Sequence, residues 1–292
     1  MFVRYCNADC QRNHWPSHKK ECKIQAAKLH DVALFKDPPA KEDCPICFLP
    51  MPYKLISCIT LPPATIMSVP VYDFAIANEE LADKAPEVYF SCCGKYICGG
   101  CMHSFRESGN DEKCPFCNSD RGKTEGEDNE DLMKRVEAND AFAMFVVGNN
   151  YMEGQLGLHH DREIAFSAME LWTQAAELGS SHAHYQLGFI YEEEGDLKKA
   201  KFHNEAAALF GHNTGRYNLG CMEFRAGNVE RAVKHWTIAA SGGDHDAMQN
   251  LLIQFKYGAL IRHTIDSTLT AYNSSCKEMR SEARDTSIRN EE

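Results

Sequence analysis

Long apolar segments are missing from this chain of 292 residues. A helix that spans a bilayer needs about 20 consecutive, mostly apolar residues, whereas the most hydrophobic stretch, residues 55–72, is interrupted by three prolines. The N-terminus, MFVRYCNADC, also lacks the apolar segment of a secretory signal peptide. We therefore expect neither a membrane protein nor a secreted precursor.

An excess of positive charge is missing as well. The formal net charge is −11, with 13 Lys and Arg against 14 Asp and Glu in residues 1–117, and 18 against 28 in residues 118–292. An acidic surface repels a phosphate backbone, so we do not expect nucleic acid as a partner. The apolar fraction of 43% and the charged fraction of 25% are ordinary for a globular protein, and the length predicts about two domains.

Cysteine is nearly missing from the second half of the chain. Of the 14 cysteines, 12 lie in residues 1–117, and only Cys221 and Cys276 lie beyond them. Such clustering indicates either a disulfide framework or metal sites. Because we find no secretory signal and several cysteines have CxxC spacing, we favour metal sites, which implies a reducing compartment, the cytoplasm or the nucleus.

The strongest pattern lies in residues 44–117, which contain three CxxC pairs and one pair of adjacent cysteines. Zinc prefers four ligands in a tetrahedron, and a CxxC turn places two sulfurs on one metal. The pairs therefore supply two complete zinc sites. Redox-active or buried thiols are one alternative, and a zinc ribbon or another zinc module is a second. The eight cysteines are Cys44, Cys47, Cys92, Cys93, Cys98, Cys101, Cys114 and Cys117.

The order of these pairs, together with the CGxxxC run that begins at Cys93, resembles a RING finger. The resemblance implies that the first and third pairs bind one zinc ion, and that the second and fourth pairs bind the other. Lys95 departs from the family pattern because it stands where a histidine ligand is common. The adjacent ligands Cys92 and Cys93 are unusual, which leaves Cys58 as an alternative, and the insert before them is long. We expect a loop or hairpin in this insert and assign it no chemistry.

A RING finger implies a ubiquitin ligase that recruits a ubiquitin-conjugating enzyme and contributes no catalytic residue of its own. Ile46 and Pro115 stand at positions that contact this enzyme in the family, and Phe116 and residues 102–105 are candidates for the rest of the contact groove. Packing around the zinc sites is an equally good interpretation of Ile46 and Phe116.

The residue after the last predicted zinc ligand, Asn118, departs from the pattern of active RING fingers. Active RING fingers often carry an arginine or lysine directly after the last zinc ligand, where this chain has Asn118, and the nearest arginine is Arg121. An asparagine donates weaker hydrogen bonds than a charged guanidinium. Whether the chain is an enzyme is therefore left open.

A second, smaller cluster occupies residues 1–24 with the spacing C-x3-C-x7-H-x3-C. It resembles the C-terminal half of a MYND zinc finger, including the HW and HKxxC features. Three alternatives stay open: the missing half precedes this chain, the four residues share one further zinc ion, or they bind no metal. These residues are Cys6, Cys10, His18 and Cys22.

Residues 132–263 repeat with a period of 32. Alanine pairs begin at residues 175, 207 and 239, each followed by a glycine three residues after the pair. The pattern resembles Sel-1-like repeats, relatives of the tetratricopeptide family, which implies an α-α solenoid that binds a protein segment. A single repeat cannot bury its own apolar face and needs its neighbours. We find no nucleophile, general base or phosphate loop in this half.

Together these patterns predict a mainly α-helical chain with a small zinc-stabilised module of short strands and one helix. We expect a zinc-binding protein-interaction protein. Our first hypothesis is a RING-type ubiquitin ligase whose solenoid recruits substrate, and the alternative is a non-catalytic scaffold or adaptor. The predicted parts are a partial finger (1–24), a helical linker (25–43), the RING-type module (44–117), an acidic linker (118–131), the solenoid (132–263) and a C-terminal helix with a tail (264–292).

Overall fold

The computed structural model describes residues 15–51, 87–110, 112–121, 125–153 and 162–289. The chain divides into two compact units, Met1–Pro38 and Pro39–Glu292. Among the described helices, none is both long and apolar enough to cross a membrane.

The described part of the first unit is dominated by one helix, α2 (Trp15–Leu34). A helix is expected within residues 25–43, and α2 differs from that expectation by beginning earlier, inside the predicted finger. It ends ahead of Pro38 and Pro39, which lack the N–H group that a helix needs and also disfavour helical backbone in the preceding residue.

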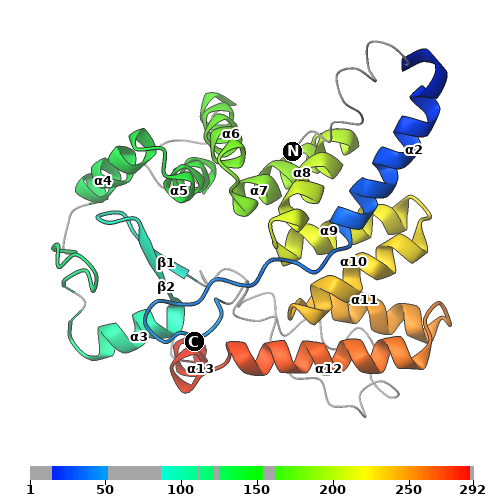
Figure 1. Cartoon of the computed structure of the whole chain (residues 1–292). Helices are drawn as coiled ribbons and strands as arrows, with labels where there is room; N and C mark the ends of the chain where they lie inside the picture. Colours follow the sequence, from blue (N-terminus) through cyan, green and yellow to red (C-terminus); the bar gives the residue numbers. More distant parts are fainter. Residues whose placement is uncertain (1–14, 52–86, 111, 122–124, 154–161, 290–292) are drawn as a thin grey trace. The chain divides into compact units, whose positions relative to one another are not determined.

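The second unit is mostly helical, as predicted. Its elements are β1 (Glu87–Phe90), β2 (Lys95–Cys98), α3 (Gly99–Glu107), α4 (Glu125–Glu137), α5 (Ala141–Glu153), α6 (Arg162–Glu177), α7 (Ser181–Glu193), α8 (Leu197–Leu209), α9 (Asn213–Arg225), α10 (Val229–Ser241), α11 (His245–Lys256), α12 (Arg262–Met279) and α13 (Glu282–Arg289). Helices α5 to α12 form four consecutive pairs that pack side by side (Figure 1).

Small residues let the two helices of a pair approach closely. A Cβ atom on Gly148 would lie 2.4 Å from the indole nitrogen of Trp172, and one on Gly220 would lie 2.6 Å from that of Trp236. Both tryptophans are buried. The large side chain of the second helix therefore fills the space that the glycine of the first helix leaves.

The period of 32 also appears in the turns between the pairs. Gly179, Gly211 and Gly243 adopt φ values of 92°, 88° and 95°, a region that side chains other than glycine rarely enter. The next residue in each case caps the following helix by accepting a hydrogen bond from a backbone N–H three residues later. These caps are Ser180, His212 and Asp244.

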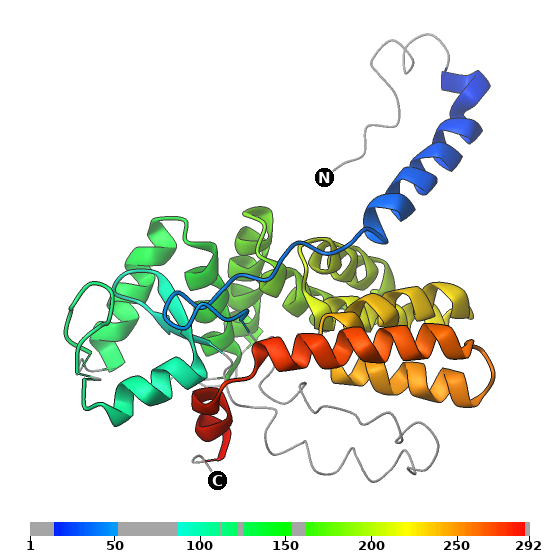
Figure 2. The same cartoon turned by 60° about the horizontal axis from the view of Figure 1, so that its bottom comes forward.

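Two predicted boundaries change at the ends of the helical repeats. The acidic linker predicted over residues 118–131 gives way to α4, whose Leu132 is buried, because its acidic residues suit the N-terminal end of a helix. The single helix expected from residue 264 is two helices. Arg280 has extended backbone between them, and the Ser281 hydroxyl accepts the backbone N–H of Arg284 to start α13. Figure 2 shows α12 running along α10 and α11.

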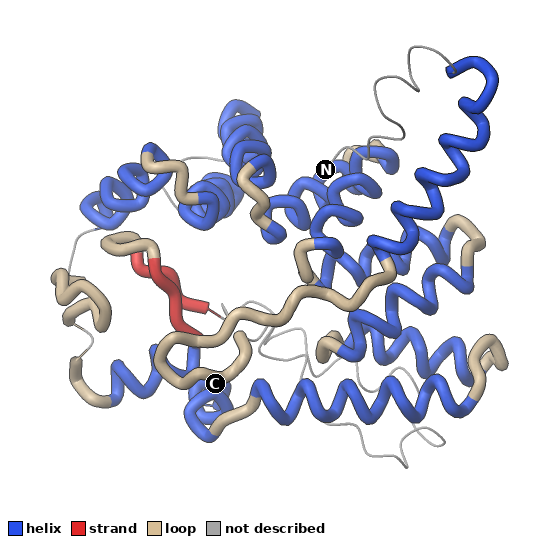
Figure 3. Tube along the Cα trace, viewed as in Figure 1, coloured by secondary structure: helices blue, strands red, loops and turns tan. Residues whose placement is uncertain are grey.

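The strands and α3 belong to a small cysteine-rich module, residues 44–51 and 87–121. Strands β1 and β2 pair antiparallel, with Val88 opposite Ile97 (red in Figure 3). Phe90, Ile97 and Met102 are buried in a core shared with cysteine side chains.

Aromatic side chains join the cysteine-rich module to α5. The ring centroids of Tyr89 and Tyr96 lie 5.1 and 5.5 Å from that of Phe142. The Tyr89 hydroxyl donates to the Asp140 carboxylate at 2.8 Å. The paired helices thus hold the module directly.

The segment before the module crosses the turns between the helix pairs. The Lys41 ammonium donates to the Gly242 carbonyl at 2.7 Å and to the Ser275 hydroxyl at 3.0 Å. A Cβ atom on Gly211 would lie 2.9 Å from the Pro39 ring. We call residues 39–43 the strap.

Candidate metal centres

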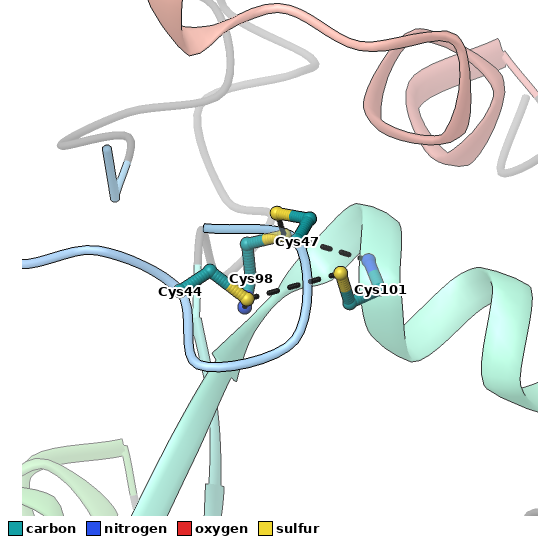
Figure 4. Close-up of side chains that lie close together, drawn as sticks. All are labelled: Cys44, Cys47, Cys98 and Cys101. Atoms are coloured by element: carbon teal, nitrogen blue, oxygen red, sulfur yellow. Dashed lines mark hydrogen bonds between the residues drawn. The ribbon is translucent and has the colours of Figure 1, made fainter. Parts of the chain in front are cut away.

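The first cysteine cluster is built from three elements. Cys44 and Cys47 lie in the loop after the strap, Cys98 ends β2, and Cys101 lies in the first turn of α3. Figure 4 shows the four sulfurs turned toward one another. The sulfurs of Cys44 and Cys101 are 3.8 Å apart, and those of Cys47 and Cys98 are 3.9 Å apart.

The second cluster combines the turn between the strands with a later loop. Cys92 and Cys93 lie in the turn, and Cys114 and Cys117 lie in the loop. The sulfurs of Cys93 and Cys114 are 3.8 Å apart, and those of Cys117 and Cys92 are 3.5 Å apart. These are the two sets of four cysteines that the resemblance to a RING finger implies.

Both clusters fit a tetrahedral metal ion. A regular tetrahedron with Zn–S bonds of about 2.3 Å has edges of about 3.8 Å. The four sulfurs of each cluster all lie within 4.8 Å of one another, and all eight cysteines are free of disulfides. The spacing is therefore that of zinc ligands, and the all-sulfur donor set is one that suits zinc.

The two CxxC loops that hold the clusters have the same backbone structure. The amide of Cys44 donates to the Leu49 carbonyl at 2.9 Å, and the amide of Cys114 donates to the Ser119 carbonyl at 2.8 Å. The residue after each CxxC pair has left-handed backbone, with φ of 57° at Phe48 and 60° at Asn118. Asparagine tolerates this conformation better than arginine or lysine does, which gives a structural reason for Asn118.

The pKa values of the clustered thiols shift in opposite directions. Hydrogen bonds from the side chain and backbone of Ser119 lower the pKa of Cys117 to about 6. Burial raises the pKa of Cys92 and of Cys101, and the neighbouring cysteines raise both further. Four thiolates at these distances repel one another, and a divalent cation among them would offset that repulsion.

The first cluster receives one contact that the sequence analysis missed. The buried guanidinium of Arg284, on α13, donates to the sulfurs of Cys98 and Cys47 at 3.3 and 3.5 Å. Cys98 and Arg284 are 186 residues apart, and no local spacing or motif connects them. Only the tertiary structure identifies this arginine.

The residues predicted for a contact groove have different environments. Ile46 is 46% exposed and Phe48, which the sequence analysis did not consider, is 76% exposed. Pro115 is half-buried. Phe116 is half-buried with its ring edge-on to Phe90 at 5.7 Å, so it packs within the module.

Residues 102–105 do not all belong to a surface groove. Met102 is 1% exposed, so its place in a surface groove was a wrong prediction: its side chain lies in the core of the module.

Two further basic residues named in the sequence analysis lie beside aromatic rings. The Arg121 guanidinium lies over the Phe90 ring at 5.0 Å. The Lys95 ammonium lies 5.0 Å from the centroid of the Phe116 ring.

Several predicted ligands lie outside the described residues. Cys6, Cys10 and Cys58 are among them, and the side chains of His18 and Cys22 are not described although their backbone belongs to α2. The ligand set of the N-terminal finger therefore stays a prediction.

Comparison with protein families matches the N-terminal end of the chain. Residues 1–22 match the family model of the MYND finger. The match covers a small part of the chain, at the position where the sequence resembles half of this finger. The comparison with curated protein sequences gives no match.

Solved structures with similarity to the chain include two proteins with helical repeats. One is a protective antigen of uropathogenic Escherichia coli strains with an SLR fold, at 20% identity and a TM-score of 0.42; the match covers 66% of this chain and 43% of the antigen, less than half of its length. The other is a Sel1 repeat protein from Oxalobacter formigenes, at 21% identity and a TM-score of 0.46, covering 62% of this chain and 72% of that protein.

Proposed function

We propose that this chain is a zinc-binding protein-interaction protein whose cysteine-rich module is a RING finger with two zinc ions. The observation that carries the proposal is the alternation of the cysteine pairs: the first and third pairs meet in one cluster, and the second and fourth in the other. This interleaving is the feature by which the sequence resembles a RING finger. Zinc would supply no chemistry beyond structure, because four cysteines leave no open position on the metal.

We further propose that the module recruits a ubiquitin-conjugating enzyme. Ile46 and Phe48 project from the first CxxC loop as exposed apolar side chains, and the half-buried Pro115 lies in the second loop, at the position that Pro45 has in the first. Exposed apolar side chains on rigid loops are suited to contact another protein. The module itself would act by bringing two bound proteins together.

The helical repeats are the proposed place for a substrate. A cleft of about 450 Å³ lies between α9, α10 and α11, and its lining includes Phe224, Arg225 and Tyr257. Phe224 and Tyr257 are 41% and 78% exposed. Aromatic and arginine side chains are frequent anchors at protein interfaces.

Ubiquitin discharge from a panel of charged conjugating enzymes tests the ligase. We expect the full chain to accelerate discharge from at least one enzyme, and Ile46→Ala to lower the rate at least tenfold, the effect of losing roughly 1.4 kcal/mol of contact energy. Leu197→Ala is the matched control, because Leu197 is a similarly exposed aliphatic residue on α8.

The scaffold alternative has its own signature in the same experiment. Bound zinc, measured by native mass spectrometry, together with no discharge from any enzyme would favour a non-catalytic adaptor. Asn118 is the observation that supports this alternative, because it lacks the charged side chain of many active RING fingers. A protein without zinc would contradict both versions.

A further inference from the structure

We propose that Arg284 stabilises zinc bound at the first metal centre through hydrogen bonds to two of its sulfurs. Helix α13, which carries Arg284, thereby lowers the rate at which this centre releases zinc. The inference rests on the proposed function in one respect, namely that Cys44, Cys47, Cys98 and Cys101 bind zinc. It concerns a residue outside the predicted module, far away in the sequence.

Arg284 uses all of its hydrogen-bonding capacity at this site. A guanidinium has five N–H donors, and here Nε donates to the Cys98 sulfur while Nη2 donates to the Cys47 sulfur and the Leu49 carbonyl. Nη1 donates to the carbonyls of Pro50 and Met279. The residue is only 2% exposed. One side chain thus ties α13 to both halves of the first cluster.

The contact places a positive charge beside the negatively charged first cluster. Four thiolates around one Zn²⁺ leave an excess of two negative charges, and a buried charge is costly unless it is paired and hydrogen-bonded. Arg284 brings one positive charge and direct N–H···S hydrogen bonds to two of the four sulfurs. Such outer contacts orient metal ligands and typically change metal affinity 10- to 100-fold when lost.

The second cluster is arranged differently. There the hydroxyl of neutral Ser119 lies 3.0 Å from the Cys117 sulfur. Arg135 donates to the backbone carbonyls of Ser91 and Cys92, each at 3.4 Å. The structure therefore provides an internal comparison: loss of Arg284 should affect the first metal and spare the second.

Gly100 shows that the backbone is shaped for this contact. A Cβ atom on Gly100 would lie 2.5 Å from the Arg284 Cγ atom and 2.6 Å from its backbone nitrogen. Helix α13 therefore rests directly on α3, and a larger residue at position 100 would push Arg284 away from the sulfurs. Gly100→Ala is a second, independent way to disturb the same contact.

Zinc release from the zinc-loaded chain of 292 residues tests the inference. A chromophoric chelator gives the release rates, and alkylation of the freed cysteines followed by peptide mass spectrometry assigns each rate to a cluster. We expect Arg284→Ala to speed release from the first cluster 10- to 100-fold and to leave the second unchanged. Arg284→Lys should restore part of the loss, since it keeps the charge without the planar fork, and Gly100→Ala should act in the same direction as Arg284→Ala.

The matched control is Arg280→Ala, because Arg280 is an exposed arginine in the same segment that pairs with Asp285 and not with a cysteine of the first cluster. We expect this variant to release zinc like the unchanged protein. Equal release from the first cluster in the unchanged protein, Arg284→Ala and Arg284→Lys would overturn the inference while leaving the zinc sites intact. Absence of zinc from the unchanged protein would instead contradict the proposed function.

Discussion

At the scale of single residues, the repeats place different side chains at one structural position. Trp172, Asn204 and Trp236 are spaced by 32 residues, and each faces a glycine of its partner helix. Asn204 is fully buried, with its amide group donating to the Ala200 carbonyl at 3.0 Å. Among the described residues its side-chain oxygen has no hydrogen-bond partner, so this position of the second repeat buries an unsatisfied carbonyl where the other two repeats bury an indole ring.

This difference yields a prediction about stability. We expect Asn204→Leu to raise the free energy of unfolding by about 1 kcal/mol, because it removes a buried, unsatisfied carbonyl and fills a similar volume with apolar atoms. Urea unfolding followed by the helical circular dichroism signal measures the change. Asn273→Leu, in α12, serves as a comparison outside this position; a loss of stability in Asn204→Leu alone would contradict the argument.

At the scale of elements, the helix pairs were predictable and the contacts that join distant elements were not. Alanine pairs and glycines 32 residues apart indicate the repeats, because small residues are needed wherever two helices cross closely. CxxC spacing likewise indicates the cysteine clusters. Arg284 was not predicted because its partners are defined by tertiary structure. The first residues of α4 were placed in the acidic linker because residues 125–131 carry no apolar side chain.

Buried and half-buried histidines in the helices make the free energy of unfolding depend on pH. Burial lowers the pKa of His182 and of His203 to about 4, and His184 adds to the effect on His203; burial also lowers that of His235 to about 3. In the unfolded chain these histidines bind a proton near pH 6.5. Their contribution to the free energy of unfolding is therefore fully present above that pH. It is lost as the pH drops toward 4, by about 1.4 kcal/mol per pH unit for each such histidine.

Urea unfolding at pH 7.0 and 5.5, with the helical signal as readout, checks this dependence. We expect His203→Phe to weaken it, because phenylalanine keeps the stacking on Tyr191 and has no proton to bind. His263→Gln replaces an exposed histidine and should leave the dependence unchanged. Comparing variants that share the same zinc sites separates this effect from acid-driven loss of metal. Identical slopes in all three proteins would refute the assignment to His203.

At the scale of the whole molecule, metal and helices contribute separately to stability within the second unit. The cysteine-rich module has a small core, so we expect a chelator to unfold it, since each structural zinc contributes on the order of 10 kcal/mol. The helix pairs have their own buried core around Trp236 and Tyr272 and should persist. Limited proteolysis combined with circular dichroism distinguishes the two: cleavage within residues 44–117 with little loss of helical signal is the expected result, and a complete loss of helix would contradict it.

The strap has a consequence for any protein that binds the helical repeats. Residues 39–43 already occupy the turns between the helix pairs, through Pro39 beside Gly211 and Lys41 bonded to the Gly242 carbonyl. A tethered segment competes at an effective concentration on the order of millimolar. A separate peptide that uses the same contacts must displace it, so weak ligands at low cellular concentration are rejected and only a partner with additional contacts elsewhere gains access to these turns.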